Sequence, residues 1–518
     1  MPRTHLMSRL QRCFRLAAAA STPGAPSIDE LVAKSRAARS SRRQFLATTA
    51  AAAAALAATP LVEAARRVRR ASQPRIAIVG AGFAGLQAAY QLGLAGFDAT
   101  VFEATKRVGG RVFTASDLLA PGLTTELGAE FIDTGHADAR SLAAEFGLEL
   151  LDDNEDPGLA EAYYYNGRHY SEEEVIAEYA PFAPLIQADY DSVPDLVDFR
   201  HPGAQQLDGI SIAQYLDGLG ITGFLRELLD VAYVTEFGRA TELQTALNLI
   251  FLIGTDVSGG TFEVFGDSDE RFRVRGGNQR IAGELAARIP GPILSEHRLE
   301  AVSARGRGFT LTFATPGGAT DVDADVVVLT LPFSVLRSVA LPDLPDFKRR
   351  AIDELPYGTN AKLLIGLSER VWRGQGYSGG VFTDESYQSG WDNSRQQPGT
   401  AGGFTMYFGG QPGVDVGAGT VAEQVALHVP GLDAAFPGVA TAQNGQVGRM
   451  HWPTTPFARG SYACYSPGQY NSIAGAEFWP IGNLYFAGEH CSYNYQGYMN
   501  GALETGRRAA SRIVRRFG

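Results

Sequence analysis

Three glycines, Gly80, Gly82 and Gly85, followed about eighteen residues later by Glu103, form the group of residues best suited to bind a ligand. Glycines at this spacing allow a tight turn, a close approach of the backbone to a pyrophosphate, and close packing of a helix on a strand. An acid at the later position binds a ribose hydroxyl. The pattern predicts a dinucleotide site with its phosphates at the positive end of a helix.

The segments around these residues alternate between strand and helix patterns. Ile76 to Val79 is a short apolar run, and a helix-type segment follows the glycine turn to about Leu94. A second strand-type run, Ala99 to Phe102, ends on Glu103. A glycine pattern alone is weak evidence, but strand, turn, helix, strand and terminal acid in this order predict a βαβ nucleotide-binding unit.

Further motifs lie at wide intervals along the chain. They are Arg107-Val108-Gly109-Gly110-Arg111, Arg275-Gly276-Gly277-Asn278, Asn360-Ala361-Lys362-Leu363-Leu364, Arg459-Gly460-Ser461-Tyr462, Leu484 to His490, and Gln496 to Ala502. Taken singly, most would be turns or ordinary strand residues, since a lysine among apolar neighbours usually extends its charge to solvent. Taken in order from about residue 75 to the C-terminus, the motifs resemble the flavin amine oxidase superfamily, which includes monoamine, polyamine and L-amino-acid oxidases.

The resemblance implies FAD as the cofactor and residues from several motifs as its contacts. In the family, the N-terminus of the last helix faces the flavin, where it stabilises negative charge on the reduced ring. The residues so implied are Gly80, Gly82, Phe83, Ala84, Gly85, Glu103, Ala104, Arg107, Gly109, Gly110, Arg111, Gly128, Ala129, Glu130, Phe131, Val302, Gly488, Glu489, Gly497, Tyr498 and Met499.

The resemblance also implies catalytic residues. Lys362 matches the family lysine that holds a water against flavin N5, and Tyr462 and Tyr498 match the two walls of an aromatic cage that steers a neutral amine. Two tyrosines can also simply pack. No histidine is assigned as a general base.

One departure from the family concerns the link to the flavin. Where covalent monoamine oxidases carry the flavin-linking cysteine, this chain has Ser461, and Cys464 lies three residues beyond. We therefore expect FAD that is bound non-covalently.

The implied reaction is oxidation of an amine to an imine, with oxygen regenerating the flavin and forming peroxide, and water hydrolysing the imine to a carbonyl product and ammonia. An amino-acid substrate needs a buried cation for its carboxylate, usually arginine. Some amino-acid oxidases of the family place an arginine after the position of Ala129, where this chain has Glu130. This favours an amine, with Glu130 as a candidate contact, although an arginine from residues 200–280 could serve an L-amino acid, including a basic one.

Two readings from other classes stay open. A related dehydrogenase would pass electrons to a quinone in place of oxygen. A non-catalytic relative would keep the fold as a binding module, although the complete glycine set with Glu103, Lys362 and Glu489 argues against this.

The predicted fold class is α/β, with a discontinuous Rossmann-like FAD-binding domain interleaved with an α+β substrate-binding domain. We assign residues 75–135, 271–340 and 456–518 to the FAD-binding domain. Residues 136–270 and 341–455 are assigned to the substrate domain, in which the acidic, tyrosine-rich segment 150–200 suggests a surface subdomain.

Composition limits the alternatives. The chain has 518 residues, 45% apolar and 19% charged, which is typical of a globular protein. Residues 1–74 hold 13 of the 45 basic and 3 of the 56 acidic residues, so the remainder carries a formal charge of -21 and lacks the basic footprint of a nucleic-acid binder. Only three cysteines occur, so neither a disulfide framework nor a zinc site is expected. Cys464 and Cys491 are expected to be free thiols, with a disulfide between them in an oxidising compartment as the alternative.

The N-terminal segment predicts export. Arg42-Arg43 precede an alanine-rich, weakly apolar run that ends near Val62-Glu63-Ala64, a pattern similar to a cleavable bacterial twin-arginine signal. A membrane anchor is the rival interpretation, but the run is short and only weakly apolar. We expect residues 1–64 to engage the twin-arginine translocation machinery and the enzyme to reach the periplasm or the medium. A homodimer stays open.

Overall fold

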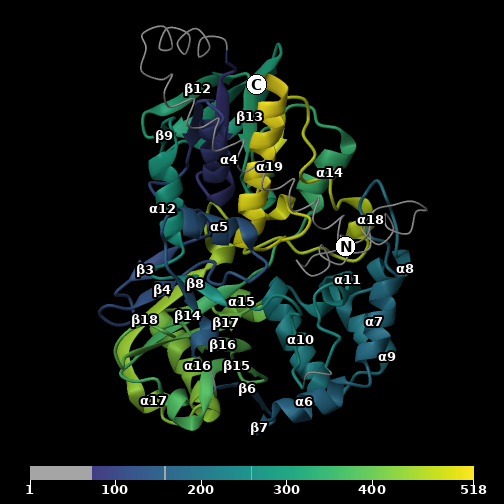
Figure 1. The fold of residues 1–518 in the computed structure, drawn as a ribbon, viewed down its shortest axis with the longest axis vertical. Helices are drawn as coiled ribbons and strands as arrows, with labels where there is room; N and C mark the ends of the chain where they lie inside the picture. The colour runs from purple at the N-terminus through teal and green to yellow at the C-terminus, as the bar shows by residue number, and fades with distance from the viewer. Residues whose placement is uncertain (1–72, 157–158, 258–259) are drawn as a thin grey trace, which may run out of the picture. The chain divides into compact units, whose positions relative to one another are not determined.

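The two strands predicted around the glycine turn lie side by side in a five-stranded parallel sheet of the computed structural model (Figure 1). The order is β19 (Leu484–Phe486), β13 (Val326–Leu329), β1 (Ile76–Val79), β2 (Ala99–Phe102) and β9 (Ile293–Leu294). Ile76 pairs with Ala99 on one side and Val326 on the other. Every residue of β1, β13 and β19 is buried, as expected for strands covered on both faces.

Helices cover this sheet. α4 (Phe83–Leu94) follows the glycine turn, and α19 (Met499–Phe517) runs beside it, because Gly506 approaches the backbone of Ala84 (Figure 1). α12 (Gln279–Arg288) packs on α4 from the other side. The strands of the sheet come from residues 76–102, 293–329 and 484–486, three stretches far apart in the sequence.

A second, mixed sheet of seven strands lies apart from the first. Its order is β18 (Gln443–His451), β14 (Ala361–Leu367), β17 (Gly402–Phe408), β16 (Ser389–Asp392), β15 (Tyr377–Thr383), β6 (Ala160–Tyr165) and β7 (Arg168–Tyr170). A parallel nucleotide-type sheet and a separate mixed sheet confirm the predicted fold class. The domain boundaries given above stay predictions.

The segment 150–200 corrects one expectation. It is not a surface subdomain, because β6 and β7 extend the seven-stranded sheet and β6 pairs with β15. Tyr163, Tyr164 and Tyr165 are buried in two hydrophobic cores. The turn residues and tyrosines of this segment favour a surface position, whereas strand pairing buries the three aromatic rings.

Shorter sheets and further helices complete the fold. The remaining strands are β3 (Thr114–Ser116) with β4 (Thr124–Glu126), β5 (Leu150–Asp152) with β8 (Phe272–Val274), and β10 (Arg298–Arg305) with β11 (Gly308–Thr315) and β12 (Gly318–Ala324). The remaining helices are α5 (Ala137–Glu145), α6 (Glu172–Tyr179), α7 (Ala183–Ser192), α8 (Gln205–Asp208), α9 (Ile212–Leu219), α10 (Gly223–Phe237), α11 (Ala246–Ile250), α13 (Phe333–Leu336), α14 (Asp346–Glu354), α15 (Gly410–Asp415), α16 (Val421–Ala435), α17 (Val439–Ala442) and α18 (Gln469–Ser472).

Local sequence explains where the helices α9 and α10 begin and end. Ser211 and Gln214 form a capping box at the start of α9, and Gly220 ends it in the left-handed conformation. α10 ends in the same way at Gly238, where φ is +70°. A side chain at Gly238 would place its Cβ 2.0 Å from Asn360 Oδ1, so only glycine allows the helix to end against this strand.

The structure describes residues 73–156, 159–257 and 260–518, and the predicted export signal lies outside them. Within these ranges no helix is long and apolar enough to cross a membrane. Cys464 and Cys491 are both buried and free, as expected.

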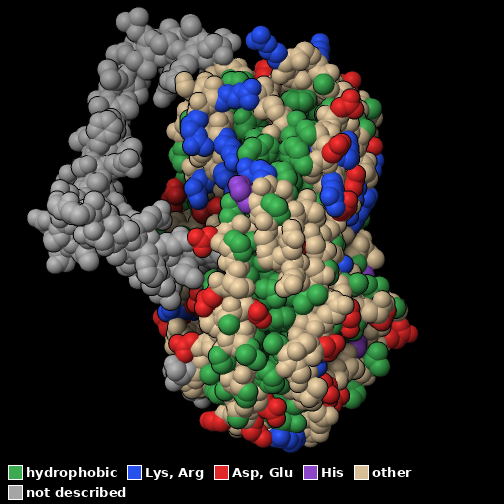
Figure 2. All heavy atoms as spheres, turned by 90° about the vertical axis from the view of Figure 1, so that its right-hand side faces the viewer, with side chains coloured by type: hydrophobic (Ala, Val, Ile, Leu, Met, Phe, Trp, Pro, Cys, Tyr) green, Lys and Arg blue, Asp and Glu red, His purple; other side chains and the backbone are tan. Residues whose placement is uncertain are grey.

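Charge is unevenly spread over the surface. On the face in Figure 2, Lys and Arg side chains gather in the upper part, the end at which α19 lies in Figure 1. The last three turns of α19 contain Arg507, Arg508, Arg512, Arg515 and Arg516. The net acidity of residues 75–518 therefore does not describe this end of the molecule.

Candidate active site

The glycine turn after β1 has space for backbone alone. Gly80 has a φ of +106°, and a Cβ there would lie 2.5 Å from Thr330 Oγ1. A Cβ at Gly85 would lie 1.9 Å from the Gly80 carbonyl oxygen. These contacts require glycine at both positions, as a phosphate-binding turn between strand and helix does.

The Arg107–Arg111 segment packs directly on this turn. Gly109 N–H donates to the Ala81 carbonyl at 2.8 Å, and Gly82 and Gly109 form a parallel bridge. Arg107 stabilises the segment from within, donating to the carbonyls of Val108 and Val112. The two motifs, predicted separately, are therefore one structural unit.

Glu103 lies where β2 ends, beside the glycine turn. Its Oε2 accepts a hydrogen bond from Ala81 N–H at 2.8 Å, and its Oε1 accepts from Thr105 N–H and the Thr105 hydroxyl. An ionised carboxylate has about four acceptor sites, so one stays available for a ligand hydroxyl.

The closing motif meets the first one through Glu489. Arg111 Nη1 donates to Glu489 Oε1 at 2.8 Å, and Gly497 N–H donates to Glu489 Oε2 at 2.9 Å. The Glu489 side chain is 7% exposed. This buried carboxylate joins parts of the chain 378 residues apart and places the start of α19 close to the glycine turn.

The residues present fit the expected FAD. Four buried polar atoms of the closing motif have no hydrogen-bond partner among the described residues: His490 Nδ1 and Nε2, Gln496 Nε2 and Asn500 Nδ2. Buried polar groups normally have partners, so orphaned atoms beside a glycine cradle indicate a polar ligand. Burial, with Arg111 and Lys348 nearby, holds the pKa of His490 well below its ordinary value, so its ring is neutral.

Lys362 lies on β14 with its side chain 5% exposed. Its ammonium donates to the carbonyls of Glu126 and Gly128 at 3.0 and 2.9 Å and to Glu130 Oε2 at 2.8 Å. An ammonium has three donors, and all three are used. Lys362 therefore fastens the 126–130 segment, and its predicted water-holding role requires one of these bonds to open.

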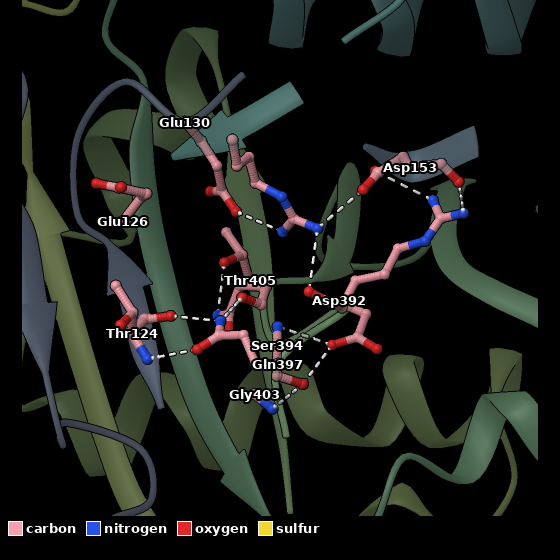
Figure 3. Close-up of polar contacts among 12 residues, drawn as sticks. Thr124, Glu126, Glu130, Asp153, Asp392, Ser394, Gln397, Gly403 and Thr405 are labelled. Carbon is pink, nitrogen blue, oxygen red and sulfur yellow. Dashed lines mark hydrogen bonds and ion pairs between the residues drawn. The ribbon is translucent and has the colours of Figure 1, made fainter. Parts of the chain in front are cut away.

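Glu130 is held between two cations. Its other oxygen, Oε1, lies 3.6 Å from Arg273 Nη1, and Arg273 in turn contacts Asp153 at 3.2 Å (Figure 3). The Glu130 side chain is 3% exposed. Both oxygens face protein cations, so the role of substrate contact that the sequence suggested for Glu130 stays a prediction that these contacts do not favour.

The two predicted cage tyrosines come together at the end of α10. Tyr498 donates to Glu236 Oε1 at 2.9 Å, while Tyr462 donates to the carbonyl of Thr235, the preceding residue, at 3.2 Å. A Cβ at Gly497 would lie 3.9 Å from the Tyr462 ring, so the tyrosines occupy adjacent positions. Neither tyrosine is positioned by its own motif alone.

Two aromatic residues that the sequence analysis missed extend this group. The hydroxyl groups of Tyr407 and Tyr462 form a hydrogen bond of 2.8 Å. Tyr407 lies on β17 directly opposite Lys362 on β14. The Trp391 ring lies 5.1 Å from Tyr407 and 5.4 Å from Phe131, and Lys362 Nζ lies 5.2 Å from its centre. The pairing of β14, β16 and β17 places these side chains on one face, and no local motif reveals strand pairing.

The acids beside the tyrosines hold their protons unusually strongly. Burial, with Asp133 nearby, raises the pKa of Glu236 to about 8. Burial likewise raises the pKa of Asp133 to about 7 and that of Glu270 well above its ordinary value. Burial also lowers the pKa of His136 to about 3, so its imidazole is neutral. The site therefore has carboxyl groups that retain protons at neutral pH and titrate as a coupled set.

The remaining predicted residues fall into two groups. Phe83, Ala84 and Met499 are buried in the first turns of α4 and α19, and Gly128 lies so close to the Arg111 carbonyl that a Cβ would meet it at 1.9 Å. Val302 lies apart on β10, 2% exposed, and donates its N–H to Ala340. The cofactor role of Val302 stays a prediction.

Ser461 is held within the protein. Its hydroxyl donates to Asn360 Oδ1 at 2.6 Å, and its side chain is buried.

Comparison with known proteins agrees with this geometry. The model of the flavin containing amine oxidoreductase family matches residues 83–514. The chain is 24% identical over 469 residues to an amine oxidase [flavin-containing] of Oncorhynchus mykiss, with 86% of each chain covered. It is 27% identical over 482 residues to a flavin-dependent L-tryptophan oxidase of Lentzea aerocolonigenes, covering 83% of this chain and 96% of the relative.

A solved structure shows the same fold. Cyclohexylamine oxidase from Brevibacterium oxydans superposes with a TM-score of 0.75 at 23% identity, covering 86% of this chain and 99% of the other. With the family model matching most of the chain, and with the glycine turn, Glu103 and the Glu489 junction assembled in one place, the chain belongs to the flavin-containing amine oxidoreductase family and is a flavin-dependent oxidoreductase.

Proposed function

We propose that this enzyme uses FAD to oxidise an amine to an imine, which water hydrolyses to a carbonyl product and ammonia. The observation that carries the proposal is the group at the end of α10, where two tyrosines meet a partly buried carboxyl group, Glu236. A carboxyl group paired with aromatic rings suits a cationic amine, because both attract an ammonium ion.

Two arginines of the range 200–280, the buried Arg273 and the partly buried Arg239, do not favour an amino acid as substrate. Arg273 is committed to Glu130 and Asp153, and Arg239 donates to the Cys464 carbonyl and the Ser466 hydroxyl. A substrate carboxylate would have to displace one of these partners. L-Amino-acid oxidation is the second candidate, supported by the similarity to the L-tryptophan oxidase.

The residues of the chain hold the site together and orient the substrate. When bound, FAD would supply the acceptor for the hydride equivalent, two electrons and one proton, that leaves the amine. Lys362 and Glu130 hold the 126–130 segment, and the next residue, Phe131, packs against Trp391. Tyr462, Tyr407 and Tyr498 present their hydroxyls and rings to one region and orient the amine there.

We further propose that FAD is held non-covalently, because Ser461 stands where covalent relatives carry cysteine and its hydroxyl is engaged by Asn360. Oxygen is the proposed acceptor of the electrons, giving hydrogen peroxide. A dehydrogenase that uses another acceptor is the alternative.

Export is a separate proposal. Arg42-Arg43 and the alanine-rich run after them support a twin-arginine signal in residues 1–64. Changing both arginines to lysine should retain the protein inside the producing cell, as a fractionation immunoblot would show; unchanged export would contradict the proposal.

The function is tested with purified FAD-loaded protein in a peroxide-coupled screen of monoamines, diamines, polyamines and L-amino acids. We expect amines to give peroxide and amino acids to give little. Flavin bleaching by an amine without oxygen, but no peroxide in air, would identify the dehydrogenase. Turnover with L-amino acids alone would overturn the choice of substrate.

A further inference from the structure

The last turn of α10 contacts both cage tyrosines through two consecutive residues. Glu236 Oε1 accepts from the Tyr498 hydroxyl at 2.9 Å, and the Thr235 carbonyl accepts from the Tyr462 hydroxyl at 3.2 Å. Glu236 therefore lies at the point where the two walls of the cage meet. No sequence motif singled it out, because it belongs to an ordinary amphipathic helix.

This helix end is fixed in place from behind. Asn360 Nδ2 donates to the Thr235 carbonyl at 2.7 Å. The Gly238 carbonyl accepts N–H groups from Thr359 at 2.8 Å and from Gly410 at 3.1 Å. Backbone held by three strand-end donors cannot shift without breaking them, so the position of the Glu236 carboxyl group is preset.

The Glu236 carboxyl group lacks a cation. Its hydrogen bond with Tyr498 uses Oε1, and within the described parts of the chain Oε2 has neither a hydrogen-bond nor an ion-pair partner. The Glu236 side chain is partly buried, and because a carboxylate in such a position is disfavoured without a cation, burial raises the pKa of Glu236 to about 8. Glu130, by contrast, is paired with Lys362.

The groups facing Glu236 from the neighbouring elements supply no positive charge either. They are Asp133, Glu270, Tyr498, Tyr462, Tyr407 and Tyr233. Asp133 accepts from the Ser268 hydroxyl and from Glu270 N–H, and its neighbour His136 is neutral. The cation missing from this arrangement would come from outside the protein.

We propose that Glu236 binds the ammonium group of the substrate and accepts one of its protons, which releases the neutral amine for oxidation. The proton moves from nitrogen to Glu236 Oε2, so that an ammonium and a carboxylate become an amine and a carboxylic acid, with no change in electron count. Tyr498 holds the other oxygen in place. This inference rests on the proposed amine oxidation.

The pH dependence of substrate binding follows from the ionisation of Glu236 and of the substrate amine. Ammonium binding requires the carboxylate form of Glu236, whose fraction grows as pH rises through about 8. Affinity for a cationic amine should therefore rise over this range and level off above it. A neutral alcohol of the same carbon skeleton should bind equally well throughout, because it needs no counter-charge.

The experiment compares holoenzyme of the wild type, Glu236→Gln and the control Glu227→Gln, an exposed residue of the same helix. The probes are benzylamine, n-butylamine and 1,4-diaminobutane, each with its matching alcohol. Anaerobic flavin bleaching measures how efficiently each amine reduces the flavin. The change in flavin absorbance on titration measures the binding of each alcohol. Removing a charge-assisted hydrogen bond should lower kcat/KM for the amines at least about tenfold in Glu236→Gln. The fall of kcat/KM at acidic pH, the acid limb of its pH profile, should disappear in this variant. The affinity for the alcohols should change less than about twofold. The control should match the wild type.

If Glu236→Gln were as active as the wild type, or lost amine and alcohol binding equally, the role of Glu236 would be wrong while the proposed amine oxidation would stand. A wild type that neither binds nor oxidises any amine would overturn the proposed function and this inference with it. Tyr498→Phe gives a second test, because the hydrogen bond from Tyr498 lowers the pKa of Glu236. Its loss should move the acid limb to higher pH, and an unmoved limb would contradict the assignment.

Discussion

Glu130 is shared between Lys362, 2.8 Å from one oxygen, and Arg273, 3.6 Å from the other, with all three side chains at most 7% exposed. A single buried carboxylate thus neutralises two cations from different sheets. Asp153 and Arg395 continue the alternation of charge toward the surface. The arrangement predicts strong coupling between the effects of substitutions at Glu130 and Arg273 on stability.

Glu130→Gln should destabilise the protein by about 3–5 kcal/mol, because it removes the carboxylate between two buried cations and leaves Lys362 without an ion-pair partner. The double variant Glu130→Gln/Arg273→Met should recover a large part of this loss, since it also removes one of the two cations. Thermal unfolding of both variants measures the effect. A double variant that is less stable than the single one would show that Arg273 acts mainly through Asp153.

Gly85→Ala should prevent FAD binding. A Cβ at this position would lie 1.9 Å from the Gly80 carbonyl, so the turn that supports the phosphates must distort. The flavin-to-protein ratio after purification should fall at least about tenfold. Gly283→Ala on α12 is the matched control, because its Cβ meets no atom within 4 Å, and it should retain full flavin.

The flavin should leave the protein on denaturation. Precipitation with acid should release all yellow colour into the supernatant, because Ser461 offers no thiol and both Cys464 and Cys491 are buried. Absorbance of the supernatant and in-gel flavin fluorescence are the two measurements. Fluorescence that stays with the polypeptide would exclude non-covalent binding.

Glu236 should make stability depend on pH. Its pKa is raised from 4.5 to about 8 in the folded protein, so between these values the unfolded chain has released a proton that the folded protein retains. Stability of the wild type therefore falls as pH rises through this window. Glu236→Gln lacks this loss, and its Tm minus that of the wild type should grow from about pH 5 to about pH 8. A constant difference would mean that neighbouring acids carry the titration.

Much of the nucleotide-binding half was predictable from sequence. The β1 and β2 runs and the glycine turn between them follow from local patterns whose length and periodicity are distinctive. The turn glycines could be recognised because their backbone conformation and close contacts exclude other residues. The tyrosine-rich strand β6 was misjudged, since an acidic composition does not reveal which sheet a strand will join.

The sequence by itself determined the cofactor class, because glycines, a terminal acid and a helix start are local features that have the same chemistry wherever they occur. It also named Lys362, Tyr462 and Tyr498. Only the tertiary structure decided what those residues touch. Strand pairing placed Tyr407 and Trp391 beside Lys362, burial enclosed Glu130 between two cations, and the end of α10 brought Glu236 to Tyr498. These contacts join residues up to 262 positions apart, and local patterns contain no information about such distances.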